Sequence, residues 1–597
     1  MFKDTFDKNT ILGIILIITM VGGYFYLSKK RFEDQAKNKT LQKELKTDLP
    51  TSSKAATIID TNKALSNPIA ISDSGKVLKG DNIELSNELI TLNVNTVGAK
   101  MNNAVLKNHK TYLNQDVKLL NDKFSSMNLS IPTAAGFVNT ANLAFQVVSK
   151  SNEKLELATS NGIKVSFVLQ PNSYVVKQIW SGTNSPKGAQ ATMQLETQMN
   201  RQETNLSRER QFSSINYLKQ NEEILSNLST TKSETIDEKT TSMKWISCGQ
   251  QFFNVSVIPQ NGFSGAILSS QYNEEDTGYV KKYNIKATLN SQENNLTLDY
   301  FIGPSEYKLL KKEGKSLELI VPLSQNFILF RWMKIFNIYL IIPIFDFLSK
   351  FFSNYGIIIL LMTLFIKIIT APLSYKTYKS GVAMKILKPQ LDLLKKKYGD
   401  DQQKYSQEQM KIFNEVGVSP FGGCLPMLLQ MPILFAMFNF FPSSIELRHQ
   451  PFLWAHDLST YDNILNLPFS FYNHISLFAL LTALTQIGMT IYSQRLQPSS
   501  PQADQMKMMT YMMPVIFLFM FNSFPAALTY YYFLQNILSM IQQWFFTTFI
   551  IKEDKVRAEM ELAKKEPKKQ GGLQKKMAEL MEQAEQQKKM QQNQNKK

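Results

Sequence analysis

A single lysine interrupts an apolar stretch in the C-terminal half of the chain. Lys367 stands in Thr363-Leu-Phe-Ile-Lys-Ile-Ile-Thr-Ala-Pro372, within the apolar run Tyr355–Ala371. A lysine near the middle of a membrane-spanning helix costs about 2.5–3.5 kcal/mol, so it usually faces a polar cavity or a partner. Position alone leaves a second interpretation open, in which the ammonium extends along the helix to the headgroups at the membrane boundary.

Uncharged polar residues lie in the neighbouring apolar runs. The most prominent are Gln430, Gln486, Gln535 and Asn536, and no acidic residue accompanies them in these runs. Single Gln or Asn residues in such helices usually form hydrogen bonds between helices. Together with Lys367, however, they could line a hydrated and positively charged groove. The sequence leaves both interpretations open.

Residue types that carry catalysis or bind metals form no recognisable cluster in the sequence. The four histidines show no ligand spacing, and the two cysteines, Cys248 and Cys424, lie far apart. A disulfide framework and a cysteine-based metal site are therefore excluded. The sequence also contains no nucleophile–base pair and no glycine-rich phosphate loop. We expect a protein that is not an enzyme and that binds no cofactor or metal.

Long apolar runs predict six membrane-spanning helices. The first run, Ile11–Leu27, contains no charge and is followed by Lys29, Lys30 and Arg31. We interpret residues 1–31 as an uncleaved anchor, because no small-residue cleavage site follows; a signal peptide is the alternative. The other runs are Tyr355–Ala371, Phe421–Phe441, Phe471–Tyr492, Met508–Phe521 and Ala526–Ile551.

The distribution of lysine and arginine predicts the orientation, because these residues are enriched in cytosolic loops. The loop after the second run is strongly basic, as is the tail after Ile551, whereas the loop 443–470 contains Arg448 as its one cation. Both termini are therefore expected in the cytosol, and residues 32–330 outside it. The cations at 29–31 favour the opposite orientation, but many more charges support this one.

Alternating apolar residues between the first two runs predict β-strands. The pattern occurs at Ile90–Val94, Ile163–Phe167, Leu296–Ile302 and Leu317–Val321. Turns are predicted at Gly98, Gly162 and Asn261–Gly262. We expect residues 81–325 to form a large antiparallel sandwich, preceded by a flexible polar linker at 32–80. Its residues form no catalytic constellation, so a scaffold or docking role is expected.

Three further segments accompany the predicted spans. Residues 326–353 are apolar but interrupted by charges, which favours an amphipathic helix at the outer interface over a further span. Residues 377–418 predict a cytosolic helical hairpin, with an apolar stripe on its first arm and a turn at Gly399–Asp401. The basic tail at 552–597 either binds rRNA or anionic lipid through its lysines, or is a disordered solubilising segment.

One long string of the chain is the run Ser419-Pro-Phe-Gly-Gly-Cys-Leu-Pro-Met-Leu-Leu-Gln-Met-Pro432. It resembles the signature of the YidC family of membrane protein insertases. Further strings follow in the family's order, and they are Trp245-Ile246, Gln250-Gln251-Phe252-Phe253, Tyr300-Phe-Ile-Gly-Pro304, Glu446-Leu-Arg-His-Gln-Pro-Phe-Leu-Trp454, Asp457-Leu-Ser459, Tyr531-Tyr532 and Gln542-Gln543. The resemblance covers nearly the whole chain, apart from the linker and the end of the tail. The large domain after the first span implies the Gram-negative form of the family.

The resemblance implies a multi-pass α-helical membrane protein with six transmembrane helices, a five-helix insertase core at 354–551 and a periplasmic all-β sandwich. Such a protein inserts, folds and assembles integral membrane proteins in the bacterial inner membrane, alone or with the Sec translocon. The implied partners are nascent membrane proteins, the Sec translocon and membrane lipids. The ribosome is a further candidate partner, through the hairpin and the basic tail.

The resemblance also implies a groove, open to the cytosol and to lipid, in which a cation attracts polar parts of the client. With the polar residues above, the expected groove residues are Lys367, Thr363, Gln430, Tyr532, Gln486 and Asn536. The client's apolar helix would leave past flexible methionines, which are Met427, Met431, Met508 and Met512. Ordinary helix packing is the alternative for the polar residues, and lipid or core contact for the methionines. Lys367 stands where many relatives carry arginine, so the stacking and bidentate contacts of arginine are not expected here.

Two other classes of protein are less consistent with the sequence. A transporter with Lys367 as its substrate site predicts inverted repeats or paired broken helices, and the sequence shows neither. A structural or signalling β-domain held by a simple anchor does not require five further apolar runs, or a lysine inside one of them.

Overall fold

The structure of the protein is a computed structural model that describes residues 80–183, 185–290, 295–323, 334–398, 401–418, 425–468, 473–494 and 512–565. Within these ranges it leaves the side chains of residues 402, 403, 406, 425–430 and 494 undescribed. All described residues belong to one structural unit. The predicted anchor, the predicted linker up to residue 79 and the tail beyond residue 565 lie outside the described residues.

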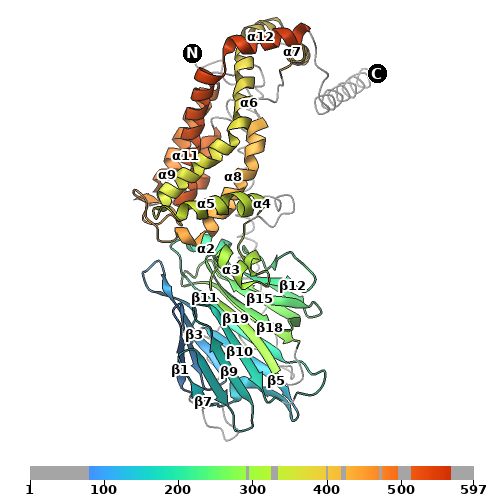
Figure 1. Ribbon diagram of the computed structural model, residues 1–597, viewed down its shortest axis with the longest axis vertical. Coiled ribbons are helices and arrows are strands. Elements are labelled where there is room, and N and C mark those ends of the chain that lie inside the picture. Colours follow the sequence, from blue (N-terminus) through green and yellow to red (C-terminus); the bar gives the residue numbers. More distant parts are fainter. Residues whose placement is uncertain are drawn as a thin grey trace, which may run out of the picture. The chain divides into compact units, whose positions relative to one another are not determined.

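Alternating apolar residues form the strands of a small antiparallel sheet (Figure 1). In β2, Ile90, Leu92 and Val94 are fully buried, while the residues between them are partly exposed. This alternation places one face of the strand in a core. The sheet contains, in spatial order, β1 (Asn82–Ser86), β2 (Ile90–Asn95), β3 (Lys100–Lys110) and β4 (Asp116–Leu120).

A larger antiparallel sheet of 15 strands follows, with the main path β6-β5-β11-β18-β17-β15-β16-β19-β10-β9-β8-β7. Strands β12, β13 and β14 branch from this path. The strands are β5 (Ser125–Thr133), β6 (Gly136–Asn139), β7 (Gln146–Lys150), β8 (Lys154–Ala158), β9 (Lys164–Leu169), β10 (Val175–Ser181), β11 (Thr192–Asn200), β12 (Ser214–Lys219), β13 (Ser226–Asn227), β14 (Glu234–Glu238), β15 (Met243–Gly249), β16 (Phe253–Pro259), β17 (Phe263–Gln271), β18 (Tyr279–Leu289) and β19 (Asn295–Pro304).

One hydrophobic core joins the two sheets. Leu92 of the small sheet lies in the same buried cluster as Trp180 and Trp245 of the large sheet. The predicted β-sandwich is therefore confirmed. The domain is not all-β, however, because it also contains the short helices α2 (Leu206–Gln211) and α3 (Tyr307–Glu313).

Three of the four predicted strands are confirmed, as β2, β9 and β19. The fourth prediction is wrong, because Leu317–Ile320 forms a 3₁₀ helix. Its buried residues, Leu317 and Ile320, are three positions apart, and this spacing places both on one side of a three-residue turn. The predicted turn at Gly262 has a φ of +72°, a conformation that glycine adopts without steric cost.

A continuous helical segment precedes the helical core and lies within the predicted amphipathic segment. Ile341, Phe345 and Leu348 are buried against the core, whereas Tyr339 and Phe347 are 76% and 54% exposed. The segment is therefore amphipathic, and its position at a membrane interface stays a prediction. It consists of α4 (Lys334–Phe336), a π-helical turn (Asn337–Ile341) and α5 (Ile342–Ser349).

Helix α6 (Tyr355–Tyr398) is a single helix of 44 residues, about 66 Å long at 1.5 Å per residue. It contains both the predicted second span and the first arm of the predicted hairpin, and it passes through Pro372 and Pro389 without ending. The second arm is α7 (Gln402–Glu415). The sequence predicted a span and a hairpin arm as two elements, whereas the structure has one continuous helix.

A helix from the start of the basic tail packs against the hairpin. In α12 (Glu553–Lys565), Val556 and Met560 are buried in one cluster with Leu387 and Leu391 of α6. The first 14 residues of the predicted tail, 552–565, are therefore folded onto the hairpin rather than separate from it.

Further helices complete the helical core. Among the described helices, α6 alone is long and apolar enough to cross a membrane by length and composition. Met431–Ser443, Leu477–Ser493 and Met512–Phe521 are apolar but shorter. The number of six spans therefore remains a prediction. The helices are α8 (Leu425–Ser443), α9 (Leu477–Gln494), the helix Met512–Phe521, and α11 (Ala526–Phe545) with its π-helical end Phe546–Ile550.

Candidate functional site

Helix α11 is the element around which the helical core is arranged, because it contacts α6, α8 and α9 (Figure 1). It starts directly after Pro525. Four of its buried polar residues are spaced by four, three and four positions, which places them in one stripe along the helix. The members of this polar stripe are Tyr532, Asn536, Ser539 and Gln543.

Lys367 of α6 meets this stripe at Ser539. The lysine is 4% exposed, and its Nζ donates a hydrogen bond to Ser539 Oγ at 2.6 Å. The Ser539 hydroxyl in turn donates to the carbonyl oxygen of Gln535 at 2.6 Å. The ammonium thus lies inside the helical core and does not extend along α6 towards the end of the helix.

The charge of Lys367 is not neutralised within the described part of the chain. Ser539 is the only described side chain that accepts a hydrogen bond from the ammonium, and no described carboxylate pairs with it. Gln542 Nε2 donates to the carbonyl oxygen of Lys367 at 3.3 Å, so the amide of Gln542 lies beside the same turn of α6. A buried cation with a neutral partner attracts an anion strongly, because the low dielectric screens its field weakly.

Thr363 lies one turn before Lys367 on α6 and is fully buried. Its hydroxyl donates to the carbonyl oxygen of Ile359 at 2.6 Å, four residues earlier in the same helix. Such local bonding satisfies the hydroxyl within the helix. Thr363 is therefore close to Lys367 in position, but its hydroxyl is engaged with its own helix.

Tyr532 lies two turns before Ser539 on α11 and faces α8. Its hydroxyl donates to the carbonyl oxygen of Leu434 at 3.3 Å. Its ring stacks on Phe521, at 5.0 Å between ring centroids and an interplanar angle of 16°. Tyr532 thereby joins three helices, and the ring contributes mainly to their packing.

Asn536 faces α9 instead. Its Nδ2 donates to the carbonyl oxygen of Thr482 at 3.3 Å and to Thr485 Oγ1 at 3.2 Å. Thr482 in turn donates to the carbonyl oxygen of Thr529 at 2.9 Å. These bonds cross between α9 and α11, which is the interhelical role expected of a single Asn in such a helix.

The remaining predicted site residues are more peripheral or lie outside the described side chains. Gln486 on α9 is half-buried, as are Met431 on α8 and Met512 on the helix Met512–Phe521. The side chains of Met427 and Gln430, and the whole of Met508, lie outside the described residues. The structure therefore places Tyr532 and Asn536 on α11 and Lys367 against it, and it leaves Thr363 bonded within α6. The methionine surface stays a prediction.

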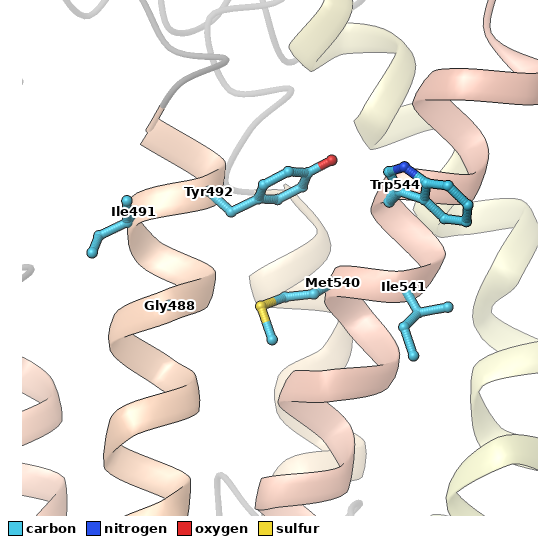
Figure 2. Close-up of a pocket in the computed structure, with 6 residues that line it drawn as sticks. All are labelled: Gly488, Ile491, Tyr492, Met540, Ile541 and Trp544. Atoms are coloured by element: carbon cyan, nitrogen blue, oxygen red, sulfur yellow. The ribbon is translucent and has the colours of Figure 1, made fainter.

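A separate apolar groove of about 450 Å³ opens between α9 and α11 (Figure 2). Tyr492 and Trp544 lie at one level of it, and Gly488 and Met540 lie one helical turn away. None of the predicted site residues lines this groove, whose walls are Gly488, Ile491, Tyr492, Met540, Ile541 and Trp544.

Both parts of the chain match known families. The family described as YidC periplasmic domain matches residues 82–335, and the family described as 60Kd inner membrane protein matches residues 347–555. A protein from Parabacteroides distasonis named membrane protein insertase YidC is 34% identical over 96% of this chain and 97% of its own length. The chain belongs to the YidC family. The resemblance seen in the sequence is therefore confirmed.

Other YidC proteins show similar coverage. The protein of the same name from Amoebophilus asiaticus is 34% identical over 93% of this chain and 94% of its own length. A solved structure described as an active YidC insertase, with its first transmembrane domain resolved, aligns with 81% of this chain and 96% of its own. Its sequence identity is 17% and its TM-score 0.33.

The two YidC family matches coincide with the two parts of the structure. The match to the periplasmic domain contains the β-sandwich, and the other match contains the helical core with α12 up to residue 555. Within this core, sequence reasoning missed Ser539, Thr482 and Thr485. A signal was present for Ser539, because it continues the helical spacing of Tyr532 and Asn536 on α11.

Proposed function

We propose that this chain is a membrane protein insertase, with nascent membrane proteins as its clients. The support is a family relationship over nearly the full chain, to proteins that carry this name. The activity is not enzymatic, since inserting a helix into lipid breaks and forms no covalent bond. It takes place in the inner membrane of a bacterium. The matched family is described as an inner membrane protein, which supports this location.

The observation that carries the proposed mechanism is the buried, unneutralised ammonium of Lys367. An acidic or polar part of a client enters from the cytosolic side and replaces Ser539 as the partner of this cation. A charge-assisted pair with a carboxylate is stronger than the bond to a neutral hydroxyl. The client's polar segment therefore gains a favourable position partway across the membrane, where it would otherwise be costly.

The polar stripe and the methionines complete this mechanism. Asn536 and Tyr532 hold α9 and α8 against α11, while Gln430 and Gln486 add polar surface to the groove. Thr363 packs one turn before Lys367, with its hydroxyl bonded within α6. The client's apolar helix then leaves along α8 and the helix Met512–Phe521, past Met427, Met431, Met508 and Met512. Thioether side chains adapt to helices of varied shape.

The proposed topology follows the positive-inside pattern of the sequence. Six helices span the membrane, both termini lie in the cytosol, and the β-sandwich lies in the periplasm. The segment Lys334–Ser349 rests at the outer membrane surface, with its exposed aromatic residues in contact with lipid. The hairpin of α6 and α7, with α12 against it, receives the client in the cytosol.

Three further partners belong to the same proposal. The Sec translocon assists with clients whose polar parts are too large for the groove. The ribosome contacts the hairpin and the basic tail, and the lysines there also favour anionic lipid.

The test is insertion of a small radiolabelled membrane protein into liposomes that contain the purified full chain. Wild type is expected to give protease-protected insertion above empty liposomes. Lys367→Met is expected to reduce it, because the cation is lost while the side-chain volume is kept. Lys379→Met is the matched control, since Lys379 lies on the same helix but pairs with Glu559 at 2.6 Å and is 34% exposed.

Equal insertion by wild type and Lys367→Met would show that the charge of Lys367 is not needed for insertion of this client. The assignment as an insertase would still hold. Insertion no better than with empty liposomes, for several clients, would contradict independent insertase activity.

A further inference from the structure

The β-sandwich is joined to the helical core by contacts that the proposed insertion mechanism does not use. Gln251 Nε2 donates to the carbonyl oxygen of Pro442 at 2.9 Å, and Asn205 Nδ2 donates to that of Ser523 at 3.3 Å. Ile445, from the 3₁₀ helix Ile445–Leu447 that follows α8, is buried in the core of the sandwich. We call this region the joint: residues 200–211 and 250–253 of the sandwich with residues 442–459 of the core.

Arg448 is at the centre of the joint and is 6% exposed. Its Nε donates to Glu203 Oε1 at 2.7 Å, and its Nη2 donates to the carbonyl oxygen of Gln202 at 3.2 Å. Its guanidinium also lies over the ring of Phe253, 5.1 Å from the centroid. One cation of the helical core is thus held by three groups of the sandwich.

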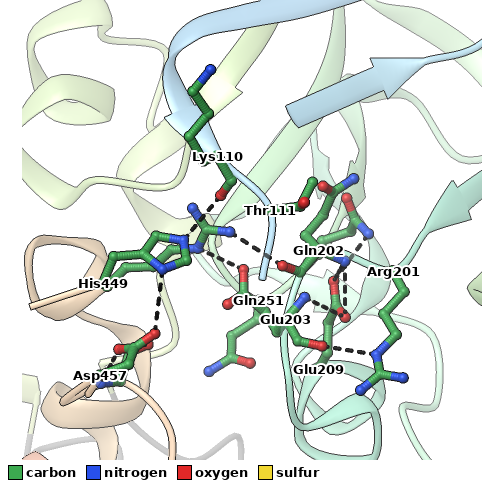
Figure 3. Close-up of polar contacts among 12 residues, drawn as sticks. Lys110, Thr111, Arg201, Gln202, Glu203, Glu209, Gln251, His449 and Asp457 are labelled. Atoms are coloured by element: carbon green, nitrogen blue, oxygen red, sulfur yellow. Dashed lines mark hydrogen bonds and ion pairs between the residues drawn. The ribbon is translucent and has the colours of Figure 1, made fainter. Parts of the chain in front are cut away.

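A second buried carboxyl group lies behind this ion pair. Glu209 of α2 is fully buried. Its carboxylate accepts from the backbone N–H of Gln202 at 3.1 Å and of Glu203 at 3.2 Å, and from Gln250 Nε2 at 3.3 Å. Figure 3 shows Glu203 and Glu209 together on the sandwich side, with His449 and Asp457 opposite. The joint therefore contains two buried carboxyl groups, and the guanidinium of Arg448 pairs with one of them, Glu203.

The other titratable groups around the joint do not balance the second carboxylate. Burial, together with the charges of Arg448 and His449, lowers the pKa of His109 to about 4, so this ring is neutral. His449 faces Asp457 at 3.7 Å. Arg208 lies over the ring of Phe524, 4.2 Å from the centroid, and Arg201 donates to the backbone carbonyl of Glu203. Arg210 is buried next to Glu209 in sequence, but its guanidinium donates to backbone carbonyl oxygens, which are those of Glu274, Asp276, Tyr279 and Val280.

The charges that act on the Glu209 carboxyl are those of Glu203 and Arg448. The hydroxyl of the buried Tyr283, on β18, donates to the carbonyl oxygen of Gly249 at 3.0 Å.

We propose that the joint binds one proton, held mainly on Glu209, and that this proton keeps the β-sandwich docked on the helical core. With both carboxyl groups ionised, Arg448 would neutralise one and leave a second negative charge buried without a partner. Such a charge costs several kcal/mol of solvation, and like charges in one buried site further disfavour it. A neutral Glu209 removes this cost and leaves a single, balanced pair between Glu203 and Arg448.

Two properties of the site agree with a bound proton. Burial raises the pKa of Glu209 well above its usual value, and the neighbouring charge of Glu203 raises it further. The described hydrogen-bond donors to the Glu209 carboxyl group are two backbone N–H groups and Gln250 Nε2. All three donors are neutral, so none of them balances the charge of an ionised Glu209. The proposal rests on the fold alone and is independent of the proposed insertase activity.

The direction of the pH dependence follows from this assignment. A carboxyl group whose pKa is raised by folding stabilises the docked state at low pH, and this stabilisation is lost as the pH rises through the folded-state pKa. Burial raises the pKa of Glu203 to about 7, against the opposing effect of Arg448. Burial also raises the pKa of Glu209. The joint is therefore expected to be closed in acid and to loosen above neutral pH.

The test is hydrogen–deuterium exchange of the full chain in lipid nanodiscs between pH 6 and pH 9.5, corrected for the intrinsic exchange rate. Wild-type peptides that cover the joint are expected to lose protection by about tenfold per pH unit, because opening the joint releases one proton. This loss should continue until the pH reaches the pKa of Glu209 in the docked joint, and should level off above it. Glu209→Gln mimics the protonated form, so its joint should stay protected throughout. Glu238→Gln changes a carboxyl group of the sandwich outside the joint, which pairs with Lys219 at 3.3 Å, and should behave as wild type.

Either of two results would overturn the proposal: a wild-type joint whose protection is constant up to pH 9.5, or a Glu209→Gln variant with the wild-type pH dependence. If Glu209→Gln fails to fold, infrared difference spectroscopy of the wild type tests directly whether a buried carboxyl group is protonated. A protonated carboxyl band that disappears at the pH where the loss of joint protection levels off supports the proposal, and absence of that band contradicts it.

Discussion

At the scale of single residues, the centre of the site is the pair of Lys367 and Ser539. A lysine within an apolar run is detectable from sequence because its burial is costly. Its partner is not, because the partner depends on how α6 and α11 are rotated against each other. Thr363 and Asn536 show the same limit, because the sequence predicted them as site residues but not their partners. The Thr363 hydroxyl is bonded within its own helix, and Asn536 is bonded to α9.

Removing the hydroxyl of Ser539 should destabilise the helical core. In Ser539→Ala the buried ammonium loses its acceptor. A buried donor left without a partner costs about 1–3 kcal/mol of folding free energy, and a charged donor such as this ammonium costs more. The measurement is urea unfolding in detergent. Ser493→Ala is the control, since its hydroxyl contacts Gln543 Oε1 at the longer distance of 3.4 Å. Equal stability of the two variants would show that Ser539 is not the group that holds the ammonium.

At the scale of elements, apolar periodicity predicted the strands and most helices, and it failed where one apolar segment fits two structures. A strand over Leu317–Val321 would bury Leu317, Leu319 and Val321 on one face, whereas the 3₁₀ turn buries Leu317 and Ile320. The polar residues beyond Ala371 indicated the end of a span, yet α6 continues to Tyr398. A helix that leaves the membrane changes its surface composition without changing its backbone, so composition alone does not locate its end.

The packing of α12 on the hairpin gives a prediction at this scale. Met560 is 7% exposed and lies in the cluster that joins α12 to α6 and α7. Met560→Ala should weaken this docking by about 2–5 kcal/mol, the usual cost of truncating a buried methionine. Limited proteolysis of the hairpin and α12 should then be faster. Leu562→Ala provides the matched control, because Leu562 is 65% exposed and its truncation should change little. The same cleavage rate for both variants would contradict the docking.

At the scale of the whole molecule, the sequence predicted a β-sandwich followed by a helical core but not the way in which they are joined. Arg448 was counted as a loop cation when the orientation was inferred, and the structure buries it against Glu203. Glu203 and Glu209 lie more than 230 positions from Arg448 in sequence, and no local pattern relates residues at that separation. Pairing of this kind is decided by tertiary structure alone.

The central claim is that the charge of Lys367 attracts acidic parts of a client, and a matched pair of clients tests it most directly. The two clients differ only in whether the short tail that must cross the membrane carries acidic residues or their amides. Their insertion is compared in liposomes that contain wild type, Lys367→Arg or Lys367→Met. We expect the acidic client to insert better than its amide counterpart with wild type and with Lys367→Arg, and this advantage to disappear with Lys367→Met. An advantage that persists unchanged in Lys367→Met would contradict the claim.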